Sequence, residues 1–425
     1  MPGLGIDFGT SNSALAVANG DQVNVLRWKI PTAVAKKDKQ EGTTLPTVFF
    51  VPHEGRDLHV GYEAIEQYLL TGLDGRFIQS IKAFLPSKNF TGTQIHGRPR
   101  TIEELIAIFL RECLAKAREQ LSASIEGPVV LGRPARFSLD DQSDQLAEKR
   151  LLKAAEIAGL SNVRLMTEPL AAARAYEARL LEDQTVMVVD LGGGTSDFTV
   201  IAVGPSHKAR PDAERVLASG GVPVAGDALD GEIVRAKLLD LFGHGSSYRV
   251  FGEPTKVPHW MFKKLLSWNQ LSFLKAAKYL DFLREVQRTS DQPEGIARLL
   301  RIVEEDLGYI MFRAVERGKQ GVQRGQSAQI EDKDYALPFS VTLMRPEFEA
   351  ATEEPIQKIR STAHEVLRRA EVTPPQIDAV FMTGGTSLVQ PVRRVFIELF
   401  GEDKLKGQDT FTSVVDGLAR AAHQL

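Results

Sequence analysis

The stretch that decides the fold is Ile6-Asp7-Phe8-Gly9-Thr10-Ser11-Asn12-Ser13-Ala14-Leu15-Ala16-Val17. It reads as an apolar strand, an aspartate, a turn of Gly, Thr and Ser, and a second apolar strand. The same order returns at Val189-Asp190-Leu191-Gly192-Gly193-Gly194-Thr195-Ser196-Asp197-Phe198-Thr199-Val200, with two more residues in the turn. Each copy predicts a β-hairpin bounded by Gly and Ser or Thr. The repeat predicts two related lobes that each offer one hairpin to a shared cleft.

The two turns carry the chemistry of a phosphate site. Turns of Gly, Thr and Ser expose backbone N–H groups and hydroxyls, which suit phosphate oxygens. Asp7 and Asp190 end the first strand of each hairpin, and two carboxylates that face phosphates indicate Mg²⁺ held largely through water. For either copy alone, an ordinary turn aspartate is an equally good interpretation. The repetition of the pattern makes that interpretation the weaker of the two. A strand–loop–helix phosphate loop with Gly-Lys-Ser/Thr is absent from the sequence.

A third glycine-rich turn, Gly384-Gly385, follows a predicted strand over 377–382 and precedes a predicted helix over 388–400. Glycine there lets a flat group or a phosphate approach the backbone near the positive end of a helix. A plain tight turn is the alternative for this pair alone. In series with the two hairpins it predicts a third wall of one nucleotide site.

Length and charge narrow the class of protein. A chain of 425 residues exceeds what one hydrophobic core usually holds, so at least two domains are expected. With 52 basic and 55 acidic side chains the net charge is −3, which gives no bulk attraction for nucleic acid or an anionic membrane. The single cysteine, Cys113, excludes an intrachain disulfide and a cysteine-based zinc cage. No signal peptide or membrane-spanning run is present in the sequence, so a soluble, cytoplasmic protein is expected.

The remaining elements follow in α/β order. Thr101 and Glu104 form a capping box that opens a helix. Its apolar face comprises Ile102, Leu105, Ile106, Phe109, Cys113 and Ala117, and this makes Cys113 a buried small hydrophobe. Further helices are predicted over 146–158, 168–181 and 346–370, and further strands over 128–131, 162–166, 186–190 and 198–203. The segment Leu238–Gln292 is rich in aromatic residues, for which all-helical core packing and a partner-binding surface are two open interpretations.

Four motifs together resemble the seventy-kilodalton heat-shock chaperone family, within the actin, sugar-kinase and heat-shock superfamily. Gly5–Ser13 is similar to the family's first phosphate motif and Asp190–Asp197 to its second. Phe381–Ser387 resembles its adenosine motif. Thr167–Tyr176, with Glu168-Pro169 followed by three alanines, resembles its most specific connecting segment and selects the chaperone branch.

The resemblance implies a two-lobed actin-like ATPase fold of α/β class, each lobe a mixed sheet flanked by helices, with a nucleotide cleft between the lobes. Lobe I is expected over 1–181 with 406–425 returning to it, and lobe II over 182–405 with an enlarged outer subdomain at about 227–345. The resemblance ends at Asp416–Ala422, where the family's ATPase domain ends. It therefore implies an ATPase domain standing alone without the peptide-binding domain, with a fragment of a longer gene product as the alternative.

Site residues transfer by motif position. Asp7, Glu168 and Asp190 are assigned to Mg²⁺, largely through water. Lys82, Glu168, Asp190 and Asp197 are assigned to catalysis, although Lys82 taken alone is an ordinary surface lysine. The residues assigned to ATP or ADP are Gly9, Thr10, Ser11, Asn12, Gly192, Gly193, Gly194, Thr195, Glu316, Lys319, Gly384, Gly385 and Thr386. Leu388 and Gln320 depart from the family's usual basic residues, which leaves open whether adenine is the preferred base.

The expected function is that of a heat-shock-chaperone-type ATP-binding protein with slow, Mg²⁺-dependent hydrolysis of ATP to ADP and phosphate. It would act as a nucleotide-driven conformational switch on a protein partner, reached through segment 238–292, with no nucleic acid or membrane partner. A small-molecule kinase of the sugar type and a filament-forming actin-like ATPase are the alternatives. The client, the pathway and the oligomeric state are not indicated by the sequence.

Overall fold

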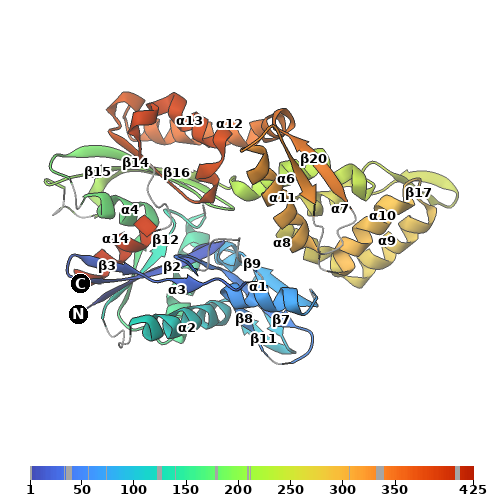
Figure 1. Ribbon diagram of the computed structural model, residues 1–425, viewed down its shortest axis with the longest axis horizontal. Helices are drawn as coiled ribbons and strands as arrows, with labels where there is room; N and C mark the ends of the chain where they lie inside the picture. Colours follow the sequence, from blue (N-terminus) through green and yellow to red (C-terminus); the bar gives the residue numbers. More distant parts are fainter. Residues whose placement is uncertain are drawn as a thin grey trace. The chain divides into compact units, whose positions relative to one another are not determined.

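The computed structural model describes residues 2–32, 34, 41–55, 57–72, 74–121, 127–138, 140–177, 180–207, 210, 212–305, 307–331, 339–406 and 412–425 (Figure 1). The chain forms two compact units. Unit 1 comprises Met1–Pro223, Ile359–Leu388 and Val392–Leu425, and unit 2 comprises Val224–Lys358 and Val389–Pro391. The predicted α/β class is confirmed. These units do not coincide with the lobes predicted from the sequence, whose boundaries stay a prediction.

The first sheet of unit 1 contains the N-terminal hairpin. Its strand order is β13 (Val163–Thr167), β12 (Val129–Arg133), β1 (Gly3–Asp7), β2 (Asn12–Asn19) and β3 (Gln22–Val25), and β6 (Leu45–Pro46) also pairs with β2. β1 runs antiparallel to β2 and parallel to β12. The hairpin is thus one part of a mixed sheet, as predicted.

The second sheet of unit 1 repeats this arrangement around the second hairpin. Its order is β16 (Val216–Val222), β15 (Ser196–Val203), β14 (Gln184–Leu191), β21 (Ala379–Thr383) and β22 (Leu405–Lys406). β14 is antiparallel to β15 and parallel to β21. In each sheet the first strand of the hairpin is antiparallel to the second and parallel to a later strand. The backbone pairing therefore confirms the internal repeat predicted from the sequence.

Two helices with small side chains, α4 (Glu168–Glu177) and α14 (Thr412–His423), pack between the two sheets of unit 1 (Figure 1). A Cβ on Gly417 of α14 would lie 1.8 Å from the carbonyl oxygen of Ala171 on α4. A Cβ on Gly5 of β1 would lie 2.4 Å from the amide nitrogen of Ala419. This close approach explains the alanine run after Glu168, since a larger side chain at the crossing would separate the layers.

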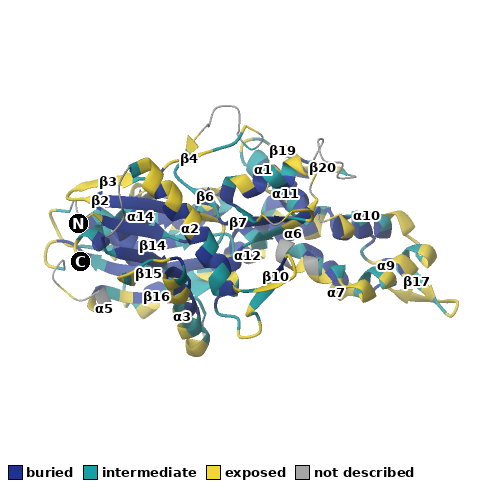
Figure 2. Cartoon of the chain, turned by 90° about the horizontal axis from the view of Figure 1, so that it is seen from below, coloured by how far each residue is buried: buried dark blue, intermediate teal, exposed yellow. Residues whose placement is uncertain are grey.

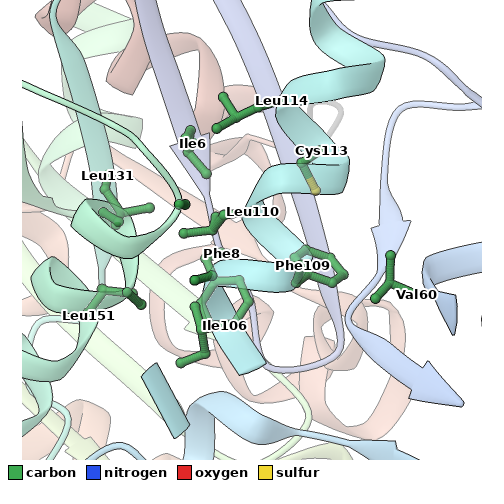
Figure 3. Close-up of a cluster of buried hydrophobic side chains, with 14 of the residues drawn as sticks. Ile6, Phe8, Val60, Ile106, Phe109, Leu110, Cys113, Leu114, Leu131 and Leu151 are labelled. Carbon is green, nitrogen blue, oxygen red and sulfur yellow. The ribbon is translucent and has the colours of Figure 1, made fainter. Parts of the chain in front are cut away.

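The other face of the first sheet is covered by α2 (Ile102–Leu121) and α3 (Asp141–Ile157). Figure 3 shows their apolar side chains meeting Ile6 and Phe8 of the N-terminal hairpin. All six residues of the predicted apolar face of α2 are fully buried, including Cys113, whose thiol pKa is raised by burial. The predicted capping box is present, with Glu104 N–H donating to Thr101 Oγ1 at 3.2 Å and Thr101 N–H donating to Glu104 Oε2 at 2.9 Å.

Two predicted helices have different bounds in the structure. The helix expected to begin at residue 146 begins at Asp141, because Asp140 accepts the N–H of Ser143 at 2.9 Å and caps an earlier start. The helix expected over 168–181 is described to Glu177, and residues 178 and 179 lie outside the described part of the chain.

Smaller elements complete unit 1. They are β4 (Trp28–Lys29), β5 (Glu41–Gly42), β7 (Val48–Pro52), β8 (His59–Val60), α1 (Gly61–Leu70), β9 (Gly75–Gln79), η1 (Ile81–Phe84), β10 (Gly92–Ile95), β11 (Arg98–Thr101), α5 (Asp212–Arg215), η5 (Pro374–Gln376), η6 (Gly385–Leu388) and η7 (Glu402–Lys404). α13 (Gln390–Phe400) packs on the second sheet, where Phe396 stacks on Phe198 with ring centroids 6.3 Å apart.

Unit 2 is mainly helical. It contains α6 (Gly226–Lys237), η2 (Leu239–Phe242), α7 (His259–Lys263), η3 (Lys264–Leu266), α8 (Trp268–Leu271), η4 (Ser272–Lys275), α9 (Ala277–Thr289), α10 (Pro293–Glu304) and α11 (Gly308–Val322). Two hairpins join them, β17 (Ser247–Val250) with β18 (Glu253–Lys256) and β19 (Ser327–Glu331) with β20 (Ser340–Met344). α12 (Arg345–Arg369) begins in unit 2 and ends in unit 1. Within the described residues, no helix is long and apolar enough to cross a membrane.

The aromatic-rich segment 238–292 is not all-helical, so the all-helical part of the core-packing interpretation was wrong: β17 and β18 form an exposed hairpin within it (Figure 2). Two groups among its aromatic residues differ in burial. Phe242 and Phe262 are fully buried, whereas Phe251, Trp260 and Phe273 are exposed. Core packing therefore accounts for one group only.

Candidate functional site

The first turn, between β1 and β2, is tight because Gly9 lets the backbone of Asn12 approach closely. A Cβ on Gly9 would lie 2.0 Å from the carbonyl oxygen of Asn12, so a side chain cannot be placed there without opening the turn. Thr10 is half-buried, and Ser11 and Asn12 are exposed. Thr47 anchors the turn by donating its N–H to the carbonyl of Ser11 at 2.9 Å. The turn therefore presents its hydroxyls and amide outward, next to Asp7 at the end of β1.

The second turn, between β14 and β15, brings two carboxylates together. Gly192 N–H donates to the carbonyl of Thr195 at 3.0 Å and closes the turn. Asp190 and Asp197 lie directly opposite each other in the antiparallel register. Thr195 Oγ1 donates to Asp197 Oδ2 at 2.9 Å, and Thr383 Oγ1 donates to Asp190 Oδ1 at 2.7 Å. The two hydroxyls fix the orientation of the two carboxylates.

A buried ion pair joins two residues that are 86 positions apart in the chain. Lys82 Nζ donates to Glu168 Oε1 at 2.7 Å, and the two side chains are only 7% and 10% exposed. Glu168 is placed by β13, which ends one residue before it, and Lys82 lies in η1 after Ser80, whose φ is +54°. Lys82 is therefore not a surface lysine, and the alternative interpretation of it was wrong.

Four carboxylates share this region, and we call Asp7, Glu168, Asp190 and Asp197 the carboxylate cluster. Burial raises the pKa of Asp7 well above its usual value, and Glu168 and Asp190 raise it further. Burial, followed by Glu168, raises the pKa of Asp190 to about 6, and burial, followed by Asp190, raises that of Asp197 to about 7.

The same negative charge stabilises the charged form of Lys82, whereas it destabilises the charged forms of the carboxyl groups. Burial alone would lower the pKa of Lys82, yet Glu168, Asp7 and Asp190 together raise it. The ammonium group is therefore protonated at neutral pH, and it is one positive charge among four carboxyl groups.

Four carboxyl groups around one lysine fit a divalent cation held through water. Carboxylate oxygens are the donors that Mg²⁺ prefers, and Mg²⁺ usually keeps several of its waters. Among the side chains described, no three from His, Cys, Asp and Glu are close enough together to ligate a metal ion directly. The assignment of Asp7, Glu168 and Asp190 to Mg²⁺ through water stays a prediction.

The third turn is clamped to the second. Gly384 has φ +79°, and a Cβ on it would lie 2.1 Å from the carbonyl oxygen of Leu191. Thr386 Oγ1 donates to the carbonyl of Gly192 at 2.7 Å, so its hydroxyl orients the turn. A Cβ on Gly385 would meet nothing within 4 Å, which leaves open space beside the backbone. The structure thus brings the turns containing Gly192, Gly193, Gly194 and Gly384 together, as the sequence predicted.

Glu316 and Lys319 lie on α11 in unit 2, whereas the other assigned residues belong to unit 1. Lys319 Nζ lies 2.7 Å from Asp230 Oδ1, and both side chains are about nine-tenths buried. Burial raises the pKa of Asp230 to about 6, although Lys319 acts to lower it. Glu316 accepts a hydrogen bond from Gln320 Nε2 at 3.1 Å. A joint role of Glu316 and Lys319 with the carboxylate cluster stays a prediction.

Two polar residues of these sites were missed from the sequence. Thr383 could have been found, because it ends a parallel strand beside the strand that carries Asp190, and parallel strands end at one edge. Asp230 gave a weaker signal. It lies three residues after Asp227 on α6, a spacing that places two carboxylates on one helix face, but nothing in the sequence pairs it with Lys319.

Comparison with known proteins gives consistent matches over the chain. A family model described as "Hsp70 protein" matches residues 79–210 and 323–424. Two relatives described as "Chaperone protein DnaK", from two strains of Thermus thermophilus, are 26% and 25% identical to this chain over 420 residues. Each alignment covers 94% of this chain and 57% of the relative, so the chain spans just over half the length of these relatives.

Proposed function

The chain belongs to the Hsp70 family, and on that premise we propose that it binds ATP with Mg²⁺ and hydrolyses it slowly to ADP and phosphate. Its fold is the two-lobed, actin-like α/β fold of that family's ATPase domain. The observation that carries the proposal is the buried Lys82–Glu168 ion pair beside Asp7 and Asp190. The relatives are described as chaperones, and a chaperone role for this chain is part of the proposal.

Lys82 supplies positive charge where a phosphoryl group would be transferred. Hydrolysis of ATP requires charge on the transferring phosphoryl group to be neutralised and a water molecule to be held in line. An ammonium fixed in a buried site stabilises developing charge more strongly than one in water. Glu168 holds Lys82 in one position, so little reorganisation is needed when charge develops.

Asp197 is suited to orient the attacking water. Its pKa of about 7 means that it can accept a proton at neutral pH, which is the range where a general base is effective. Thr195 fixes one of its oxygens at 2.9 Å and leaves the other available. Asp7, Glu168 and Asp190 would hold the waters of Mg²⁺, and the ion supplies charge neutralisation at the phosphates when bound.

The proposed switch follows from what the three turns would contact. ATP and ADP differ in one phosphate, so any turn that binds that phosphate loses a contact after hydrolysis. A ligand shifts a conformational equilibrium only by its difference in affinity for the two states. The turns at Gly9–Asn12 and Gly192–Thr195 are the candidates for this difference, and segment 238–292 is the candidate surface for a protein partner.

The test is thermal unfolding of the full chain with millimolar Mg-ATP, together with release of phosphate. A ligand at about 100 times its Kd adds about 2.7 kcal/mol of stability, which a melting curve detects. Asp7→Asn is expected to weaken this stabilisation, whereas Asp21→Asn, in an exposed turn, is not. A wild-type melting temperature unchanged by Mg-ATP would contradict the proposal. Transfer of the γ-phosphate to a sugar would favour a kinase, and pelleting with ATP would favour a filament.

A further inference from the structure

One part of unit 2 combines exposed aromatic rings with a high density of positive charge. Residues 245–280 contain six basic side chains and one acidic side chain, a net charge of +5 with His neutral, whereas the whole chain carries −3. This part lies outside both ranges matched by the family model. Of its aromatic residues, Phe251, Trp260 and Phe273 are 104%, 41% and 60% exposed.

The tip of the β17–β18 hairpin places a phenylalanine where folding does not favour one. Phe251 and Gly252 form the two-residue turn, with φ of +51° and +90°. A turn of this type prefers Asn-Gly, because a bulky residue at positive φ is strained. The ring of Phe251 is also fully exposed, so it contributes nothing to the core. A residue with a strained backbone and an exposed ring indicates a role in contact with another molecule.

Helix α9 joins the hairpin and helix α7 into one surface. Tyr248 of β17 packs edge to face on Phe282 of α9, with ring centroids 5.5 Å apart. Trp260 of α7 packs in the same way on Tyr279 of α9 at 5.1 Å. Tyr279 and Phe282 are three residues apart, so they lie on one side of α9. The hairpin and α7 therefore both contact this side of α9.

Lysines are placed over these rings. Lys278 Nζ lies 4.7 Å from the ring centre of Tyr279, and Lys264 Nζ lies 5.2 Å from that of Phe273. Lys264 follows Trp260 by four residues, which places the two on one side of the continuous α7–η3 turn. Within the part of the chain that the structure describes, neither Lys264 nor Lys278 pairs with a carboxylate, and Lys264 Nζ donates to the neutral Gln270 Oε1 at 3.0 Å. Their charge is available to a partner.

We propose that this surface binds an acidic protein segment that also carries bulky apolar residues. We call it the basic–aromatic face, and it comprises Phe251, Trp260, Lys263, Lys264, Phe273, Lys278 and Tyr279. Carboxylates of the partner would pair with the lysines, and its apolar side chains would cover the exposed rings. This proposal specifies the chemistry of the protein partner in the proposed function. Binding of the partner does not depend on ATP hydrolysis, but the role of that binding rests on the proposed function.

Glu253 distinguishes a protein from other negatively charged partners. It is exposed and lies two residues after Phe251, at the tip of the hairpin. Membrane headgroups and nucleic acid phosphates present negative charge along their whole surface and would meet this carboxylate wherever Phe251 makes contact. A protein segment can place an apolar residue there and its carboxylates opposite the lysines.

The test uses the full chain and a fluorescein-labelled synthetic peptide in which Asp and Glu alternate with Leu and Phe. Fluorescence anisotropy without nucleotide is expected to give a Kd in the micromolar range at low salt, on the order of 1–100 µM. The peptide with Asn and Gln in place of Asp and Glu is expected to bind at least tenfold more weakly. The double variant Lys263→Glu/Lys278→Glu is expected to lose at least tenfold, while Lys149→Glu, an exposed lysine on α3 in unit 1, is expected to leave binding unchanged.

Phe251→Asn separates a binding role from a structural one. Asn-Gly suits the turn, so this variant is expected to melt no lower than the wild type, yet to bind the acidic peptide several-fold more weakly. Equal binding of the acidic and amide peptides, or an equal loss in Lys149→Glu, would overturn the proposal. So would binding of phosphatidylserine vesicles or of a single-stranded oligonucleotide without binding of the peptide. Stabilisation by Mg-ATP is measured on the same proteins: its absence with peptide binding retained would refute the ATPase proposal and leave this one standing.

Discussion

Replacing Asp197 with asparagine is expected to stabilise the nucleotide-free protein at high pH. The amide has the shape of the carboxylate, and its oxygen can still accept the hydroxyl of Thr195. In the wild type, burial and Asp190 raise the pKa of Asp197 from 3.8 to about 7. The folded state therefore binds this proton more tightly than the unfolded state. Its stability falls as the pH rises from about 4 to about 7 and stays lower above that range.

The size of the effect follows from the shift in pKa. A shift of about three units corresponds to at most about 4 kcal/mol, so we expect Asp197→Asn to gain about 2–4 kcal/mol at pH 8. At pH 4.5 Asp197 is protonated in the folded state, whereas in the unfolded state it has already lost most of its proton. The gain in stability should therefore fall to about a quarter of its value at pH 8. The two measurements differ only in pH, so packing effects of the substitution cancel.

The assay is urea unfolding followed by circular dichroism, at pH 4.5 and pH 8, with a chelator and without nucleotide. Asp21→Asn serves as the matched control, because it removes one exposed carboxylate from a turn in the same unit. A variant less stable than the wild type at pH 8, or an equal gain at both pH values, would refute the reasoning about Asp197.

Three other changes test the remaining contacts. Lys82→Ala is expected to retain ATP but hydrolyse it at least tenfold more slowly, about 1.4 kcal/mol in the barrier, in single-turnover experiments; an unchanged rate would remove Lys82 from the catalytic residues. Gly384→Ala should lower the melting temperature and Mg-ATP binding, since its Cβ would meet the carbonyl of Leu191 at 2.1 Å, while Gly385→Ala, with open space, should keep the fold; similar melting of both would contradict this. Lys319→Met should cost about 3–5 kcal/mol in urea unfolding by leaving Asp230 buried without its partner, and Lys319→Met/Asp230→Asn should cost less; an equal cost would show that the pair is not coupled.

The sequence predicted the parts of the fold that depend on local pattern. The hairpins around Asp7 and Asp190 were found because continuous apolar runs on both sides of a Gly-rich turn are local signals. The start of α3 at Asp141 was missed, because its first turn is polar and only the capping role of Asp140 marks it. The exposure of Phe251 could not be read from the sequence either, since an aromatic residue in a core and one at a hairpin tip look alike in composition.

For the site, the sequence predicted which residues belong to it but not which of them contact each other. Motif positions assigned Lys82 and Glu168 separately, but their contact depends on how η1 and α4 meet, which no local pattern encodes. The same holds for Lys319 and Asp230, which lie on different helices of unit 2. Where a hydroxyl fixes a carboxylate, as Thr383 does for Asp190, the strand order supplies the information and the residue type alone does not.

The position of Cys113 makes the protein convenient for chemical labelling. Its thiol lies fully buried on α2, and its raised pKa leaves almost no thiolate to react at neutral pH. Maleimide reagents should therefore modify a cysteine introduced at an exposed position while sparing the native one, so fluorophores can be attached without first removing Cys113. The native thiol in turn becomes reactive only when α2 separates from the first sheet, and its rate of modification reports how often that core opens.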